Sequence, residues 1–138
     1  MTVIARLAQT IDALKRCERS GNSDGVKLHK LTIRHIEDNF LPSGSGIDVG
    51  TKVDVEKSAA ERVVLDTAYH HMNDGGCYDG WTEHTITITP SLAHGFNIRI
   101  SGRDRNDIKD YLHDVFWTAL GESCEPYARA AQREEAAG

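Results

Sequence analysis

Two arginines just before the last amphipathic segment could bind an anion. Arg103 and Arg105 lie in the run GRDRN, and Lys109 follows one helical turn later. A helix beginning here would add the positive end of its dipole to these cations, and guanidinium groups bind phosphate in a bidentate geometry. Arg105 and Lys109 are four residues apart, so a helix places them on one face. The arginines could equally pair with the aspartates at positions 104, 107 and 110, and the sequence leaves both interpretations open.

A second candidate for ligand contact is the glycine-rich run from Ser43 to Gly46, which Asp48 follows. Glycines allow successive backbone N–H groups to converge on an anion, and the hydroxyls of Ser43 and Ser45 add donors. The run lacks the GxxxxGK[ST] pattern of a P-loop. A surface loop without a ligand explains the same residues.

A third candidate is the segment from Cys77 to Trp81, which the sequence predicts to be a turn. Tyr78 and Trp81 could stack on a planar base there. The alternative is a hairpin whose Trp81 packs over the edge of a sheet.

The remaining reactive residue types form no recognisable catalytic or metal-binding pattern. The chain has seven histidines and three cysteines, but no CxxC, HxH or HExxH spacing and no GxSxG motif. We therefore expect no catalytic residue, no metal ligand and no cofactor, and we expect that the protein is not an enzyme.

Composition limits the class of protein. The chain has 138 residues, 39% of them hydrophobic, and a formal net charge of −5. This length suits one compact domain, and an acidic chain is not expected to bind nucleic acid in general. The chain contains no apolar run of the roughly 18 residues that a membrane span needs and no signal-peptide pattern, so we expect no membrane association. Three widely spaced cysteines favour a reducing compartment, the cytoplasm.

Hydrophobic periodicity predicts an α+β fold: a two-layer sandwich of a mostly antiparallel four- to five-stranded sheet, one N-terminal helix and a long C-terminal helix. Residues 1–121 form the single predicted domain, and residues 122–138 are a tail rich in Ala, Glu and Arg that is either a short helix or disordered. The polar outward positions of the last strand suggest that one sheet face meets solvent or a partner. The predicted elements are a helix from residue 3, strands at 31–34, 52–56, 62–70, 82–89 and 96–101, and a helix at 108–120 for which Asp104 is the predicted N-cap. The first helix has one apolar stripe, made of Val3, Ile4, Leu7, Ala8, Ile11 and Leu14. In the last two strands alternation predicts one inward face, Ile86, Ile88, Phe96, Ile98 and Ile100, and one outward face, Thr85, Thr87, Thr89, Asn97, Arg99 and Ser101.

Four stretches together resemble a group of small phage-encoded accessory proteins, the anti-Thoeris "sponge" family. The resemblance covers roughly residues 28 to 120. Its stretches are Leu41–Asp48 (LPSGSGID), Tyr69–Met72 (YHHM), Tyr78–His84 (YDGWTEH) and Gly102–Leu112 (GRDRNDIKDYL).

The resemblance implies a phage immune-evasion protein that works in the cytoplasm of the host cell. Such a protein sequesters a cyclic nucleotide signal of the cyclic ADP-ribose type, and some members also hold cyclic oligonucleotides, without cleaving them. It implies a homo-oligomer with the ligand held between protomers. By this resemblance Tyr78 or Trp81 would stack on adenine, and Arg103, Arg105 and Lys109 would bind phosphate.

Two other functions remain open at this stage. An acidic surface could mimic nucleic acid and make the protein an inhibitor that binds a host defence complex, as anti-CRISPR proteins do. A small hydrolase or phosphodiesterase acting on the same nucleotides is the third hypothesis.

Overall fold

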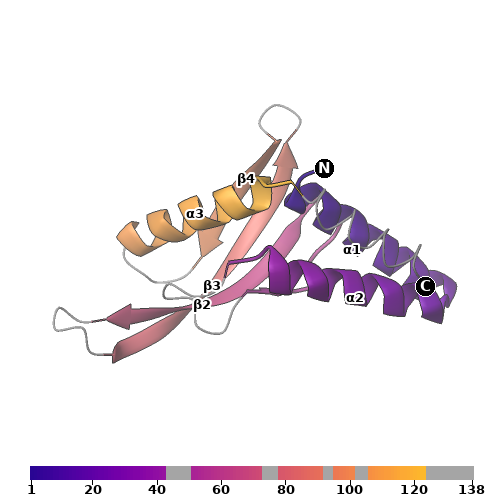
Figure 1. The fold of residues 1–138 in the computed structure, drawn as a ribbon, viewed down its shortest axis with the longest axis horizontal. Helices are drawn as coiled ribbons and strands as arrows, with labels where there is room; N and C mark the ends of the chain where they lie inside the picture. Colours follow the sequence, from indigo (N-terminus) through magenta and orange to yellow (C-terminus); the bar gives the residue numbers. More distant parts are fainter. Residues whose placement is uncertain (43–50, 73–77, 92–94, 102–105, 124–138) are drawn as a thin grey trace.

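The chain folds into three helices and a four-stranded antiparallel sheet (Figure 1). The computed structural model describes residues 1–42, 51–72, 78–91, 95–101 and 106–123. The fold is α+β, with two N-terminal helices where the sequence predicted one, and a C-terminal helix packed on the sheet. The elements are α1 (Val3–Ser20), α2 (Ser23–Asn39), β1 (Lys52–Val53), β2 (Val63–Met72), β3 (Tyr78–Ser91), β4 (Gly95–Ser101) and α3 (Asn106–Gly121).

Helix α1 follows the predicted apolar stripe. The Thr2 hydroxyl caps its start by accepting a hydrogen bond from the Ala5 N–H, 3.2 Å away. Gly21 ends the helix in the left-handed conformation, with φ of 73°, and the N–H of Asn22 closes the cap on the Cys17 carbonyl. All six stripe residues are buried, as predicted: Val3, Ile4, Leu7, Ala8, Ile11 and Leu14.

The predicted strand at 31–34 is wrong, because these residues belong to helix α2. The alternation of Leu31 and Ile33 with polar residues is also compatible with a helix, in which the side chains of Leu31 and Ile33 point to different sides of the helix axis. Ile33 and Ile36 are buried, whereas Leu31 is 54% exposed. Asn22 caps the start of α2 by accepting from the Gly25 N–H at 3.0 Å. Ile33, Ile36 and the partly buried Phe40 follow one another at intervals of three and four residues, which is the spacing of a helix packed on one side.

Strand β1 is shorter than the predicted Lys52–Glu56. Asp54 turns the chain instead: its carboxylate accepts from the Lys57 N–H at 3.1 Å. The Ser58 hydroxyl donates to the Asp54 carbonyl at 2.6 Å and accepts from the Val64 N–H at 2.8 Å. The Asp54 N–H still donates to the Val64 carbonyl at 2.9 Å. Together these bonds close a compact turn that leads into β2, so the strand ends before the predicted Glu56.

The β2–β3 pair is the longest part of the sheet and extends past the helices at one end (Figure 1). The predicted turn at Cys77–Trp81 is wrong for its described part, because Tyr78 to Trp81 already belong to β3. A register shift between His71 and Met72 accommodates the pairing near this end of the ribbon. Cross-strand pairing continues on both sides of this irregularity, so the local turn signals of Asp79 and Gly80 do not end the strand.

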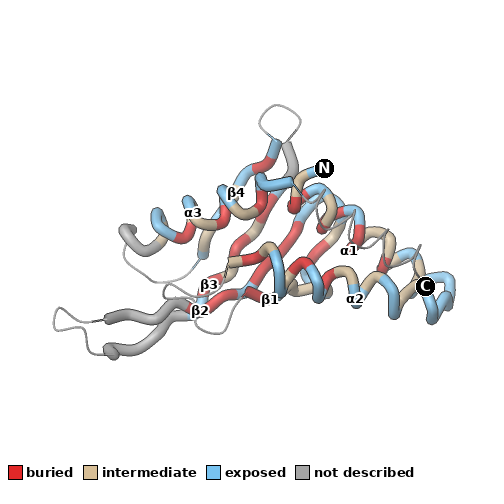
Figure 2. Tube along the Cα trace, viewed as in Figure 1, coloured by how far each residue is buried: buried red, intermediate tan, exposed pale blue. Residues whose placement is uncertain are grey.

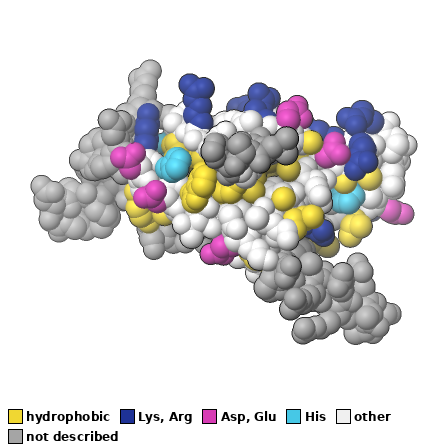
Figure 3. Space-filling model, turned by 90° about the horizontal axis from the view of Figure 1, so that it is seen from above, with side chains coloured by type: hydrophobic (Ala, Val, Ile, Leu, Met, Phe, Trp, Pro, Cys, Tyr) yellow, Lys and Arg dark blue, Asp and Glu magenta, His cyan; other side chains and the backbone are white. Residues whose placement is uncertain are grey.

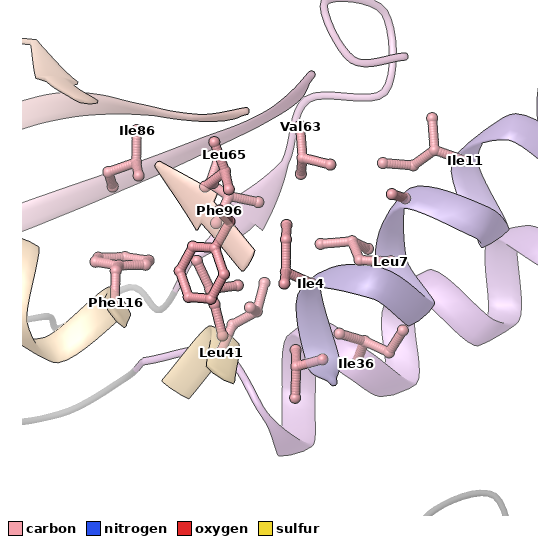
Figure 4. Packing of buried hydrophobic residues seen from close by; sticks show 14 of the residues in the cluster. Ile4, Leu7, Ile11, Ile36, Leu41, Val63, Leu65, Ile86, Phe96 and Phe116 are labelled. Carbon is pink, nitrogen blue, oxygen red and sulfur yellow. The ribbon is translucent and has the colours of Figure 1, made fainter. Parts of the chain in front are cut away.

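All three helices contribute to one core against a single face of the sheet (Figures 2 and 4). Phe116 of α3 and Leu7 of α1 are completely buried there. The sheet's inward side chains alternate along each strand, as period-two patterning requires. They include Val63, Leu65, Ile86, Ile88 and Phe96. The inward positions predicted for β3 and β4 are therefore confirmed.

The opposite face of the sheet is largely polar. Thr85, Thr87 and Thr89 alternate with the buried isoleucines of β3, and Asn97, Arg99 and Ser101 are exposed on β4, as predicted. One antiparallel face that packs while the other meets solvent is the usual arrangement when helices lie on a single side.

Helix α3 packs through Leu112, Phe116 and Leu120, which are all completely buried. After α3, the Val3 N–H donates to the Glu122 carbonyl at 2.8 Å, and Thr2 pairs with Ser123. The chain therefore returns to its own N-terminus at residues 122–123. The predicted N-cap Asp104 and the rest of the predicted tail, 124–138, lie outside the described residues.

Candidate functional site

A row of buried polar side chains crosses the core face of the sheet. Thr51, Thr67 and His84 are 2%, 5% and 2% exposed. They are lateral neighbours, because Thr67 pairs with His84 across β2 and β3, and Thr51 precedes the Lys52–Asp66 pair. Buried polar groups are costly unless they are hydrogen-bonded. A row of three on an otherwise apolar face therefore needs a structural or functional reason.

Hydrogen bonds link the row to Pro42 at one end and to Ser101 at the other. The Thr51 hydroxyl donates to the Pro42 carbonyl at 2.8 Å, and its oxygen lies 3.5 Å from that of Thr67. The Nδ1 atom of His84 lies 3.1 Å from the Ser101 carbonyl oxygen. A carbonyl only accepts, so Nδ1 carries the proton, and in the neutral ring Nε2 is then the basic nitrogen.

These bonds hold the described residues next to two segments that the sequence singled out, 43–50 and 102–105. Pro42 and Thr51 are the described residues on either side of segment 43–50, and Ser101 is the last described residue before segment 102–105. Among the described strands, β2 and β3 alone continue beyond the row, as the ribbon of Tyr69–Met72 and Tyr78–Thr82. The two segments therefore start on opposite sides of the base of this ribbon (Figure 1).

The structure places the predicted site residues to different extents. Lys109 lies in the first half of α3 and is partly buried, on the side that carries Leu112 and Phe116. The backbone of Tyr78 and Trp81 lies in β3, paired with Met72 and His70. Their side chains, and the residues Ser43, Ser45, Arg103 and Arg105, lie outside the described part of the structure.

Sequence reasoning missed Thr51 and Thr67, and with them the polar row, although the signal was available. His84 shares its parity with Ile86 and Ile88, so the alternation of β3 already puts an imidazole on the apolar face. Thr67 has the same relation to Val63 and Leu65 in β2. A polar residue at an inward position of a strong alternating pattern is the sign to look for.

No three His, Cys, Asp or Glu residues of the described chain lie close enough together to hold a metal ion. None of the described helices is long and apolar enough to span a membrane.

Comparison with known proteins adds no relative: no family model matches the chain, and neither the curated proteins nor the solved structures compared with it show a significant similarity.

Proposed function

We propose that this protein binds a small cyclic nucleotide of the cyclic ADP-ribose type and withholds it from a host immune pathway without cleaving it. The observation that carries the proposal is the buried row of Thr51, Thr67 and His84. Its hydrogen bonds fix the bases of a Gly/Ser segment and of an arginine-bearing segment on the two sides of one β ribbon. Ligand contacts often come from segments that a rigid scaffold anchors in this way.

Each segment contributes a different kind of contact. Arg103 and Arg105 follow Ser101 and precede α3, whose N-terminus adds positive potential for a phosphate. Ser43 and Ser45 are the proposed hydroxyl donors, in the segment that follows Pro42 and precedes Thr51.

The ribbon supplies the aromatic part of the proposed site. Tyr78 and Trp81 are both on β3, and either ring stacks on a purine in the proposed complex. Lys109 adds a cation one turn into α3, where the residue is already partly buried.

Sequestration requires tight binding and no nucleophile. A dissociation constant of about 1 nM corresponds to roughly 12 kcal/mol of binding free energy. A single exposed cationic segment is a poor source of so much energy, because water competes for each contact. We therefore propose that the ligand is enclosed between protomers of a homo-oligomer, in the cytoplasm of a phage-infected cell.

Calorimetry tests the binding directly. Purified protein titrated with cyclic ADP-ribose isomers, and separately with cyclic di- and trinucleotides, is expected to release heat with at least one of them. Absence of binding to the whole panel would remove the proposal. Mass spectrometry of small molecules released by denaturing the protein, after expression in cells that make these signals, identifies the ligand.

Two further measurements separate this function from its alternatives. Chromatography of the nucleotide after incubation and denaturation returns it intact from a binding protein, whereas a hydrolase returns product. Capture of a host defence complex, with affinity that falls steeply with added salt, would favour a protein-binding inhibitor. The net charge of −5 is the observation on which that alternative depends.

A further inference from the structure

The outward face of α2 carries cations and leucines that are exposed and that no residue of the described part of the chain pairs with or buries. Lys27, Lys30 and Arg34 are exposed, and no described residue forms an ion pair with any of them. Leu28 and Leu31 lie among them and are 58% and 54% exposed. The helix's exposed acids, Asp24 and Asp38, lie at its two ends. We call Lys27, Leu28, Lys30, Leu31 and Arg34 the cationic face.

The outward face of α3 has the opposite character. Asp110 and Asp114 lie one turn apart and are exposed; the side chain of Asp114 is 89% exposed, with its carboxylate 3.9 Å from His113 Nδ1. Tyr111 and Trp117 flank them and are 38% and 43% exposed. We call Asp110, Tyr111, Asp114 and Trp117 the acidic aromatic face.

The Trp117 ring has a fixed support. It packs on Phe96 with 4.6 Å between ring centroids, and the His113 ring stacks on it at 6.0 Å. Phe96 itself is 6% exposed and belongs to the core. A large aromatic ring held in place by the core and left 43% exposed loses little entropy on binding, and such rings are enriched at protein interfaces.

The two faces lie in different parts of the molecule. In Figure 3, acidic side chains stand beside hydrophobic ones at the left, on the side of α3, while Lys and Arg side chains stand along the upper edge and at the right, with some acidic side chains among them. Helix α1 packs against both α2 and α3. Because each face points away from its own core, one chain cannot bring its two faces together.

We infer that the cationic face of one copy binds the acidic aromatic face of a second copy of this chain. The charges are complementary, and the exposed leucines and aromatic rings bury apolar area against each other. Pairing of two identical faces is disfavoured, because it would bring cations against cations or carboxylates against carboxylates. The contact is therefore between unlike surfaces, and each copy carries both halves of it.

A membrane fits the cationic face less well. The large apolar side of α2, with Ile33 and Ile36, is buried in the core, which leaves two leucines for insertion. Interfacial helices use a broad apolar face for that purpose. The inference is also separate from the proposed function, because the contact needs no nucleotide and uses none of the proposed ligand residues. The two proposals share only the formation of an oligomer.

Charge reversal tests the contact. The variants Lys27→Glu/Arg34→Glu and Asp110→Lys/Asp114→Lys change exposed side chains, so circular dichroism should show both folded. Light scattering after size exclusion is expected to find the wild type oligomeric and each variant dissociated, with the dissociation constant raised by about tenfold or more. Adding salt should also weaken the wild-type oligomer.

Combining the two charge reversals in one chain gives the decisive measurement. One reversed cationic face and one reversed acidic face repel their wild-type partners but are complementary to each other, so the chain carrying all four changes should again assemble. A wild type that stays monomeric, or an oligomer that neither reversal affects, would overturn the inference. Co-sedimentation of a monomeric wild type with phosphatidylserine vesicles, lost in Lys27→Glu/Arg34→Glu, would assign the cationic face to a membrane instead.

A nucleotide titration keeps the two proposals apart. If the reversal variants dissociate but still bind cyclic nucleotide, the interface inference holds and the proposed enclosure of the ligand between protomers does not. If the oligomer is intact and no nucleotide binds, the proposed function fails alone.

Discussion

The Nδ1 atom of His84 lies 3.1 Å from the carbonyl oxygen of Ser101, the last residue of β4. The donor is buried in the core, and the acceptor is at the point where the chain leaves the sheet toward segment 102–105. This bond thus couples the packing of the core to the base of the proposed anion-binding segment.

Replacement of His84 tests this coupling. His84→Leu removes the donor and is expected to lower the free energy of unfolding by about 1–3 kcal/mol. His84→Asn retains an amide N–H near the position of Nδ1 and should keep more of the hydrogen-bond contribution. Urea denaturation measures both. Equal losses would mean that the imidazole acts through its volume and not through the hydrogen bond to Ser101.

The two buried threonines are expected to differ in their effects. Thr51→Val leaves the Pro42 carbonyl without its donor and should cost about 1–3 kcal/mol of unfolding free energy. Thr67→Val keeps that bond and removes only a long contact of 3.5 Å, so it should cost less than about 1 kcal/mol. Denaturation of the two matched variants provides the comparison, and a larger loss for Thr67→Val would contradict the assignment of the stronger bond to Thr51.

Truncation of Phe116 should be among the most damaging changes in α3. The side chain is completely buried between the helix and the sheet, so Phe116→Ala is expected to destabilise the protein by roughly 3–5 kcal/mol. Leu31→Ala, at an exposed position of α2, is the control and should change stability by no more than about 0.5 kcal/mol. Thermal melting with calorimetry measures both, and similar melting temperatures would argue against the packing described.

The end of α1 depends on a residue that tolerates a positive φ. Gly21 adopts φ of 73°, and a Cβ there would meet nothing within 4 Å, so any cost of substitution comes from backbone conformation and not from a clash. Gly21→Ala is expected to cost about 1 kcal/mol, and Gly21→Asn less, because Asn adopts the left-handed region more readily. Equal stability of all three proteins in urea would show that the cap is unimportant.

The proposed anion contact predicts a selective effect of Arg105. Arg105→Ala should weaken nucleotide binding strongly in calorimetry while the melting temperature changes little. Arg99→Ala is the matched control, because Arg99 is exposed on the opposite face of the sheet. Unchanged affinity of Arg105→Ala would remove this residue from the site, and an equal loss for Arg99→Ala would show a general effect of charge.

The sequence predicted those elements whose pattern has one interpretation. The stripe of α1 and the alternation of Ile86 and Ile88 each fit a single period, and the structure confirms them. The segment around Leu31 and Ile33 did not meet this condition. Four residues are too few to separate period two from period 3.6, and here the wider spacing of Ile33, Ile36 and Phe40 reveals the helix.

The candidate site was predictable in part for a similar reason. The types of Arg105 and Trp81 indicate their chemistry without any fold. Which segments start near each other depends on strand order and register, and register is fixed by contacts between residues far apart in the chain. The pairing of Thr67 with His84 is of this kind.

By itself, the sequence determined the α+β class, the inward faces of β3 and β4, the buried side of α1 and the chemical character of the segments near Ser43 and Arg103. The tertiary structure alone decided that a second helix follows α1 and that a buried polar row crosses the sheet, bonded to Pro42 and Ser101, the described residues next to those segments. The physical reason is the range of the interactions. Side-chain periodicity and capping act within a few residues, whereas strand register and the covering of one helix face by another depend on packing between distant parts of the chain.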